Sequence, residues 1–210
     1  PVEKDLPNIT QTSVNVTAGM TFAVGLRALL RQDPDIIMIG ETRDAETAEI
    51  SVRSAITGHL VVSTLHTNDA ISSIVRLADM GVAPYLISNS VVGIVAQRLV
   101  RKVCQFCKYE EPATAEDIAI VGDGIPMITR GKGCKVCNNT GYKGRISIHE
   151  MVYIDKTLKR MIARSADSQE MLEYAKKTQG MRSLMDSAID LVKEGVTTPE
   201  EVMKIAYYSD

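Results

Sequence analysis

The chain has 210 residues, of which 45% are apolar, and its 24 basic and 26 acidic side chains give a net charge of −2. This length is enough for one large or two modest domains, and the composition excludes global disorder. No apolar run approaches the ~18 residues of a membrane-spanning helix, and the polar first residues predict no signal peptide. We therefore expect a folded protein without membrane insertion.

The first hundred residues alternate between helical and strand-like patterns. Apolar residues at helical spacing begin at Phe22, and Pro34 predicts that this helix ends before Asp33. The continuous apolar run over 36–40 is typical of a strand buried on both faces. A strand, a helix and a second strand within about 30 residues favour a parallel, helix-covered sheet. The expected elements are helices over 22–32, 44–57, 69–80 and 84–97 and strands over 36–40 and 60–65.

Polar residues follow both predicted strands, where ligands bind in parallel sheets. Glu41 could bind Mg²⁺ or orient a water for attack on a phosphoryl group, or it is an ordinary acid near the start of a helix. His66 could donate to a phosphate, or it is a loop histidine. Arg27 and Arg31, four residues apart, could neutralise phosphate charge, or they form a solvated basic stripe. The pattern of residues leaves these alternatives open.

Four cysteines form two pairs, Cys104-x-x-Cys107 and Cys134-x-x-Cys137, with none left over. Two such pairs can place four thiolates around one Zn²⁺ at Zn–S distances of ~2.3 Å. Two disulfides or an iron–sulfur cluster are the alternatives, and disulfides would need an exported chain, which nothing in the sequence indicates. We expect a structural zinc site, because all four ligands come from the protein.

A phosphate-binding loop of the form G-x-x-x-x-G-K-[ST] is absent from the sequence. Residues that could act on a phosphate are therefore present without the loop that would hold one.

Several stretches together resemble one family, the type II secretion and type IV pilus-assembly ATPases. Residues 29–44, LLRQDPDIIMIGETRD, resemble its Walker B region, and residues 57–68, TGHLVVSTLHTN, resemble its histidine box. Residues 97–104, QRLVRKVC, resemble the segment that leads into its tetracysteine zinc motif. The run GYKGR at 141–145, followed by His149-Glu150, matches the segment after the second cysteine pair.

This resemblance implies an α/β fold: a partial RecA-like P-loop NTPase core with a parallel sheet, a tetracysteine zinc lobe and a C-terminal helical subdomain. The implied domains are the second half of the ATPase core over 1–100, the zinc lobe over 101–145 and the helical subdomain over 146–210. The family's phosphate loop is expected before the first residue of this chain, so we expect these 210 residues alone to show no appreciable ATP binding or turnover.

The resemblance also implies roles for individual residues. Glu41 corresponds to the Walker B glutamate that supports Mg²⁺ and the attacking water, and His66 to the histidine that contacts the γ-phosphate of ATP. Arg27 and Arg31 match arginines that stabilise phosphate charge, and Glu3 is a weak match to the tail of an acidic motif. The four cysteines match the family's zinc ligands.

The implied function is that of an ATP-hydrolysing motor in the cytoplasm, peripheral to the inner membrane. In this family a homohexamer acts through an inner-membrane platform protein and its cytoplasmic adaptor, and drives pilins or pseudopilins into a fibre. The tetracysteine insert favours secretion and fibre extension over retraction. The sequence does not separate secretion from pilus assembly.

A competing interpretation is a zinc-stabilised interaction module without catalytic activity. Residues 98–145 carry 9 basic and 5 acidic side chains, a net +4, against −4 for 1–97 and −2 for 146–210. The +4 segment could attract an acidic partner. A nucleic-acid-binding zinc ribbon is disfavoured, because aromatic residues are few there and the rest of the chain is acidic. We therefore expect no nucleic-acid partner.

Overall fold

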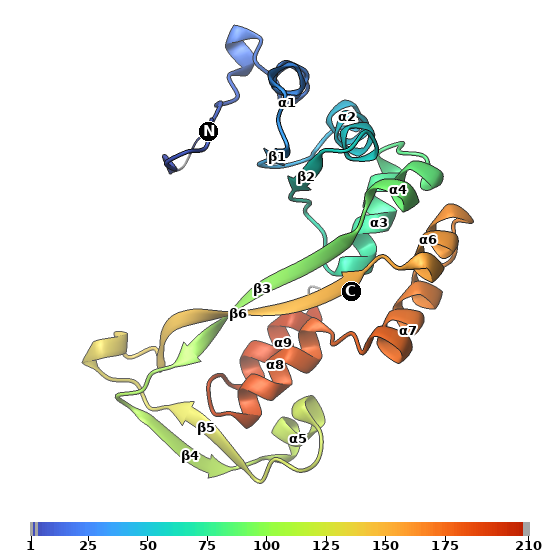
Figure 1. Ribbon diagram of the computed structural model, residues 1–210. Helices are drawn as coiled ribbons and strands as arrows, with labels where there is room; N and C mark the ends of the chain where they lie inside the picture. Colours follow the sequence, from blue (N-terminus) through green and yellow to red (C-terminus); the bar gives the residue numbers. More distant parts are fainter. Residues whose placement is uncertain (1, 3, 208–210) are drawn as a thin grey trace. The chain divides into compact units, whose positions relative to one another are not determined.

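The computed structural model describes residue 2 and residues 4–207, which belong to two compact units (Figure 1). The first unit comprises Pro1–Thr67, Ser72–Val92 and Ile154–Met171, and the second comprises Asn68–Ile71, Gly93–Tyr153 and Leu172–Asp210. The division into domains over 1–100, 101–145 and 146–210 stays a prediction. Within the described residues, no helix combines the length and apolar character that crossing a membrane would require.

The secondary structure alternates between helices and short strands. The helices are α1 (Phe22–Leu29), α2 (Ala45–Ile56), α3 (Ala70–Asp79), α4 (Pro84–Ser90), α5 (Ala115–Val121), α6 (Lys156–Ala163), α7 (Ser168–Gln179), α8 (Leu184–Lys193) and α9 (Pro199–Tyr207), with 3-10 turns η1 (Val16–Ala18), η2 (Leu30–Gln32) and η3 (Lys135–Cys137). The strands are β1 (Ile36–Ile39), β2 (Leu60–Ser63), β3 (Gly93–Val103), β4 (Lys108–Pro112), β5 (Met127–Gly131) and β6 (Tyr142–Tyr153).

In the first unit, β1 and β2 form a parallel pair joined by α2, which confirms the predicted strand–helix–strand unit. Asp44 caps α2 by accepting the backbone N–H of Thr47 at 2.8 Å, and this cap sets where the helix begins after β1. A small core of Leu26 from α1 with Ile37 and Ile39 from β1 holds the strands against the helices. This packing therefore fixes the position of the end of β1.

The prediction that β1 is buried on both faces is wrong. Ile37 and Ile39 are buried, but Ile36 and Met38 each expose 65% of their surface. On the neighbouring strand, Leu60 is 52% exposed. A continuous run of apolar residues is suited to a strand that is covered on both faces. Among the described residues, however, only the face of β1 that carries Ile37 and Ile39 packs against other residues.

In the second unit, β3 and β6 form a long antiparallel ribbon, and β4 pairs with β5 in the same manner. The predicted helix over 84–97 is wrong in its second half, because α4 ends at Ser90 and residues 93–97 belong to β3. Gly93 pairs with Tyr153, so partners some sixty residues away select the strand, as tertiary pairing often overrides local preference. One register shift, between Arg101 and Val103, interrupts the ribbon.

The ribbon and the two last helices enclose the main core of the second unit. Residues of β3, β5, β6, α5, α8 and α9 pack together there with Ile125 of the loop before β5 (Figure 1). The buried members are Val100, Val121, Ile125, Ile128, Ile148, Leu184, Ala188, Val192, Val202 and Ile205.

Glu150 of β6 is a buried carboxylate that joins the starts of two helices. It is 4% exposed, and its Oε1 and Oε2 accept the backbone N–H groups of Ala70 at 2.9 Å and Leu184 at 3.3 Å. These residues begin α3 and α8, whose first N–H groups need acceptors. Burial raises the pKa of Glu150, and the two backbone donors oppose that rise. This carboxylate therefore fixes where both helices begin.

We expect Glu150→Gln to lower the free energy of unfolding by about 1–3 kcal/mol, because a buried N–H then faces an amide NH₂ instead of an oxygen. Urea unfolding at neutral pH measures the change. Glu173→Gln is the matched control, since its side chain is 55% exposed and pairs only with Lys177, so a change below about 0.5 kcal/mol is expected. Equal effects of the two substitutions would contradict the assignment.

Candidate functional site

The segments after β1 and β2 are tied together by short hydrogen bonds. The backbone N–H of Thr42 donates to the carbonyl of Thr64 at 3.0 Å, and the Thr64 hydroxyl donates to the carbonyl of Gly40 at 2.6 Å. The hydroxyls of Thr42 and Ser63 are 2.8 Å apart. These bonds extend the parallel pairing beyond the strands, so the side chains that follow each strand meet at one edge.

Glu41 and His66 meet at this edge, as the strand order predicts. His66 Nε2 lies 2.6 Å from Glu41 Oε1, and Arg43 Nη2 lies 2.5 Å from Glu41 Oε2. The Glu41 side chain is only 14% exposed. Its Oε1 is buried, and His66 Nε2 is the nitrogen at ion-pair distance from it.

The charge of Glu41 is set by its neighbours. The hydrogen bond from Arg43 lowers the pKa of Glu41, burial opposes this, and the positive charges of Arg43 and His66 lower it further. The net shift is downward, so Glu41 is ionised at neutral pH. An ionised, partly buried carboxylate suits a hard cation such as Mg²⁺ or a water that it can orient.

A cleft of about 290 Å³ opens beside this carboxylate. Its lining combines Glu41 and Thr42 with His66, Arg43 and Arg76. Two guanidinium groups and an imidazole around one carboxylate fit a phosphate that is accompanied by a cation. The sequence analysis missed Arg43 and Arg76: the position of Arg43 two residues after Glu41 is a signal for it, whereas Arg76 lies on α3 and no local pattern marks it.

The two arginines predicted to contact phosphate do not line this cleft. Arg27 lies in α1 and forms an ion pair with Glu46 at 2.6 Å, and both side chains are more than half exposed. Arg31 is exposed in the turn η2, because the α-helix already ends at Leu29. Glu3, the weak match to an acidic motif, lies outside the described residues.

The four cysteines are free thiols whose sulfur atoms all lie within 4.8 Å of one another. The Sγ–Sγ distances are 3.9 Å for Cys104–Cys134, 3.9 Å for Cys107–Cys137 and 3.7 Å for Cys134–Cys137. A tetrahedron with metal–sulfur distances of ~2.3 Å has edges of about 3.8 Å. The four sulfurs therefore have the spacing of a single tetrahedral ion, and they are far from the ~2.05 Å of a disulfide.

Backbone groups complete this cluster. The N–H of Cys134 donates to Cys137 Sγ at 3.2 Å. Burial raises the pKa of Cys137, but backbone donors from Cys134 and Gly141 together with the Cys134 and Cys107 thiols lower that pKa to about 6, whereas burial raises the pKa of Cys107 to about 12. Gly141 has φ +78°, and a Cβ on Gly131 would lie 2.2 Å from the Gly141 carbonyl oxygen. Glycines are required where the two cysteine turns approach so closely.

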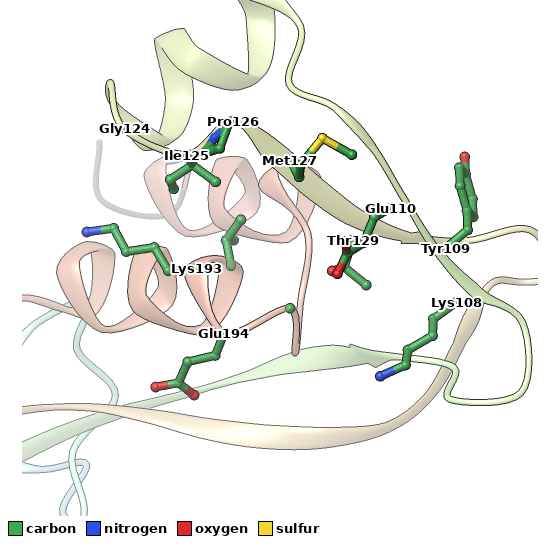
Figure 2. A pocket seen from close by; sticks show the side chains of 12 residues that line it. Lys108, Tyr109, Glu110, Gly124, Ile125, Pro126, Met127, Thr129, Lys193 and Glu194 are labelled. Carbon is green, nitrogen blue, oxygen red and sulfur yellow. The ribbon is translucent and has the colours of Figure 1, made fainter.

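A larger cavity of about 570 Å³ lies in the second unit, between β4–β5 and the end of α8 (Figure 2). Its lining includes two lysines, Lys108 and Lys193, and two glutamates, Glu110 and Glu194, and neither histidine nor cysteine. The charges balance, so this cavity lacks the excess of cations that a phosphate needs. The cleft beside Glu41 is the better candidate for a catalytic site.

The chain is similar to known secretion and pilus-assembly proteins over almost its whole length. A family model described as type II/IV secretion system protein matches residues 1–204. The chain is 49% identical over 205 residues to the type II secretion system protein HxcR of Pseudomonas aeruginosa, covering 98% of this chain and 40% of that protein. It is 47% identical over 208 residues to the type IV pilus assembly ATPase PilB of Thermus thermophilus, covering 97% of this chain and 23% of that protein.

Solved structures show the same α/β fold. The pilus retraction motor PilT with bound ADP superposes with a TM-score of 0.62 at 28% identity, covering 88% of this chain and 43% of that one. The ATPase DotB of Legionella pneumophila gives a TM-score of 0.59 at 22% identity over 89% of this chain and 42% of that one, a likeness of fold alone. The chain spans less than half of each of these proteins. From the family model and these relatives, the chain belongs to the type II/IV secretion system protein family.

Proposed function

We propose that the complete protein is an ATP-hydrolysing motor of type II secretion or type IV pilus assembly, and that this chain is the second half of its RecA-like ATPase domain. The observation that carries the proposal is the buried carboxylate oxygen Glu41 Oε1 beside His66 Nε2, in a cleft lined by His66, Arg43 and Arg76. The relatives named above are proteins of these two machineries.

Each residue of the cleft has a role in this proposal. Glu41 orients the attacking water through Oε1, and Arg43 fixes the carboxylate through Oε2. His66 and Arg76 stabilise negative charge that develops on the phosphate. Mg²⁺, when bound with ATP, would neutralise negative charge on the phosphate oxygens. Arg27 and Arg31 lie apart from the cleft lining, and we propose that they act on a nucleotide across a subunit boundary.

The proposal extends to the surroundings of the motor. The complete protein assembles as a cytoplasmic homohexamer, peripheral to the inner membrane, and acts through a platform protein and its cytoplasmic adaptor to extend a fibre of pilins or pseudopilins. The four cysteines hold a structural Zn²⁺, in line with their sulfur spacing and their all-protein donor set. These statements rest on the relatives and on the motifs that the chain shares with them.

A comparison of the complete protein with the 210 residues tests the proposal. We expect saturable ATP binding and turnover by the complete protein, and neither by this chain alone, because it contains no phosphate loop. Equilibrium binding of a fluorescent ATP analogue and release of inorganic phosphate are the measurements. ATP binding by the 210 residues would contradict the second expectation, and a complete protein without turnover would favour the zinc-stabilised interaction module.

A further inference from the structure

We propose that the part of the second unit around the two cysteine pairs is a docking surface for an acidic protein segment, with Phe106 as its apolar anchor. This knuckle surface consists of residues 101–109 and 130–145, at one end of the β3–β6 ribbon (Figure 1). The two segments are joined by the metal-ligand cluster and by the backbone bond from Lys132 N–H to the Cys107 carbonyl. The proposal does not depend on nucleotide turnover.

The knuckle surface has an excess of positive charge. Its two segments contain eight lysines and arginines and no aspartate or glutamate. Arg101 is paired with Glu201, and Arg130 with Asp117 among other acids. The remaining six cations have no carboxylate at ion-pair distance in the part of the chain that the structure describes. They are Lys102, Lys108, Lys132, Lys135, Lys143 and Arg145.

A bound metal ion does not account for this charge. A divalent ion held by four thiolates carries −2, which offsets two of the six cations and leaves an excess of about four. The positive charge therefore exceeds what the metal site needs.

Apolar side chains stand exposed among these cations. Phe106 and Val136 occupy the same position in the two cysteine pairs, directly before the second cysteine, and they are 74% and 41% exposed. Lys143 Nζ lies 5.8 Å from the centre of the Phe106 ring. An exposed aromatic residue with a cation beside its ring resembles a protein interface, in which an aromatic anchor is surrounded by a polar rim.

An acidic protein segment fits this surface better than a membrane or a nucleic acid does. Stable attachment to a membrane needs more apolar insertion than Phe106 and Val136 provide. Binding of single-stranded nucleic acid uses several stacking platforms. The other two aromatic residues of the knuckle surface, Tyr109 and Tyr142, are half-buried, and their rings already have Lys132 Nζ at 5.1 Å and Arg101 Cζ at 3.9 Å. A partner segment with carboxylates around an apolar pocket would pair with the cations and would bury the phenyl ring of Phe106.

The test uses the complete protein and two peptide probes of equal charge, one of glutamate and serine and one of glutamate and leucine. We expect the glutamate–leucine peptide to bind at least tenfold more tightly, with an affinity that falls as salt rises. Phe106→Ser should abolish most of the difference between the peptides. Lys132→Glu with Lys143→Glu should weaken binding of both at least tenfold.

The matched control is Lys156→Glu with Arg160→Glu, the same change of charge on the exposed side of α6, and it should change binding less than twofold. Zinc content and thermal unfolding of every variant establish that the fold is kept, and phosphate release establishes that turnover is unchanged in Phe106→Ser. Equal binding by Phe106→Ser and the parent protein would overturn the proposal. Preferential binding to phosphatidylglycerol vesicles or to single-stranded DNA would overturn it in favour of those partners.

Discussion

Replacing Glu41 by glutamine in the complete protein is expected to slow ATP hydrolysis by about 100-fold or more, a loss typical of removing a group that directs proton transfer. Glutamine keeps the size of the side chain, so the cleft and its hydrogen-bonded rim should remain. It cannot accept a proton from the attacking water, and its neutral amide does not attract a cation. The measurements are the rate constant of phosphate release and the dissociation constant of ATP, which should change less than about threefold if the loss is in the transition state alone.

Glu49→Gln provides the matched control for this substitution. Glu49 lies on α2, its side chain is 53% exposed, and it pairs with Arg53 at 2.7 Å on the helix surface. Its replacement should leave both hydrolysis and ATP binding unchanged. Unchanged turnover in Glu41→Gln would remove Glu41 from its proposed role, and a large loss of ATP binding would assign it to holding the nucleotide rather than to the chemical step.

Removal of the metal ion is expected to unfold the two cysteine turns. Structural zinc sites bind with an apparent free energy of about 10–16 kcal/mol at neutral pH, and that energy becomes folding energy when no preformed site exists in the unfolded chain. The sulfur atoms lie 3.7–3.9 Å apart, a spacing that mutual repulsion of four thiolates would widen if no cation lay between them. Metal analysis should give about one zinc per chain.

A strong chelator, or Cys104→Ser, should lower the thermal unfolding temperature and open residues 101–145 to proteases. Re-addition of Zn²⁺ should restore the chelated protein, and Mg²⁺ should not, because thiolates prefer softer ions. Metal-free protein with the same unfolding temperature and protease resistance would contradict a structural role. The Cys104→Ser variant should bind zinc more weakly and should not recover fully at the same zinc concentration.

The sequence predicts best where chemistry fixes the spacing. The cysteine pairs are recognisable because two thiolates three residues apart can share one ion, and the structure brings all four sulfurs together. The β1–α2–β2 unit is recognisable because its breaks are local: Pro34 ends one helix, Asp44 caps the next and Gly58 follows it. The position of Glu41 relative to His66 then follows from the parallel pairing.

The sequence does not predict features that depend on partners far away in the chain. Residues 93–97 have no local signal that excludes a helix, and only pairing with the far end of β6 makes them a strand. Arg76 reaches the cleft because of the path of α3, which no pattern in the sequence specifies. Arg27 forms its ion pair with Glu46 on another helix, whereas periodicity along α1 indicates only a basic stripe. The predictions fail at these residues because contacts with residues far away in the sequence, rather than residue types, decide their structure.

The exposed face of the β1–β2 pair has a consequence for handling the isolated chain. Ile36 lies beside Leu60 and Met38 beside Val62 in register, and all four side chains are between 46% and 65% exposed. Such a row of apolar groups on a two-stranded sheet favours stacking between molecules. The solubility of these 210 residues should therefore fall in ammonium sulfate, which strengthens apolar burial, and rise when Met38 is replaced by a charged residue.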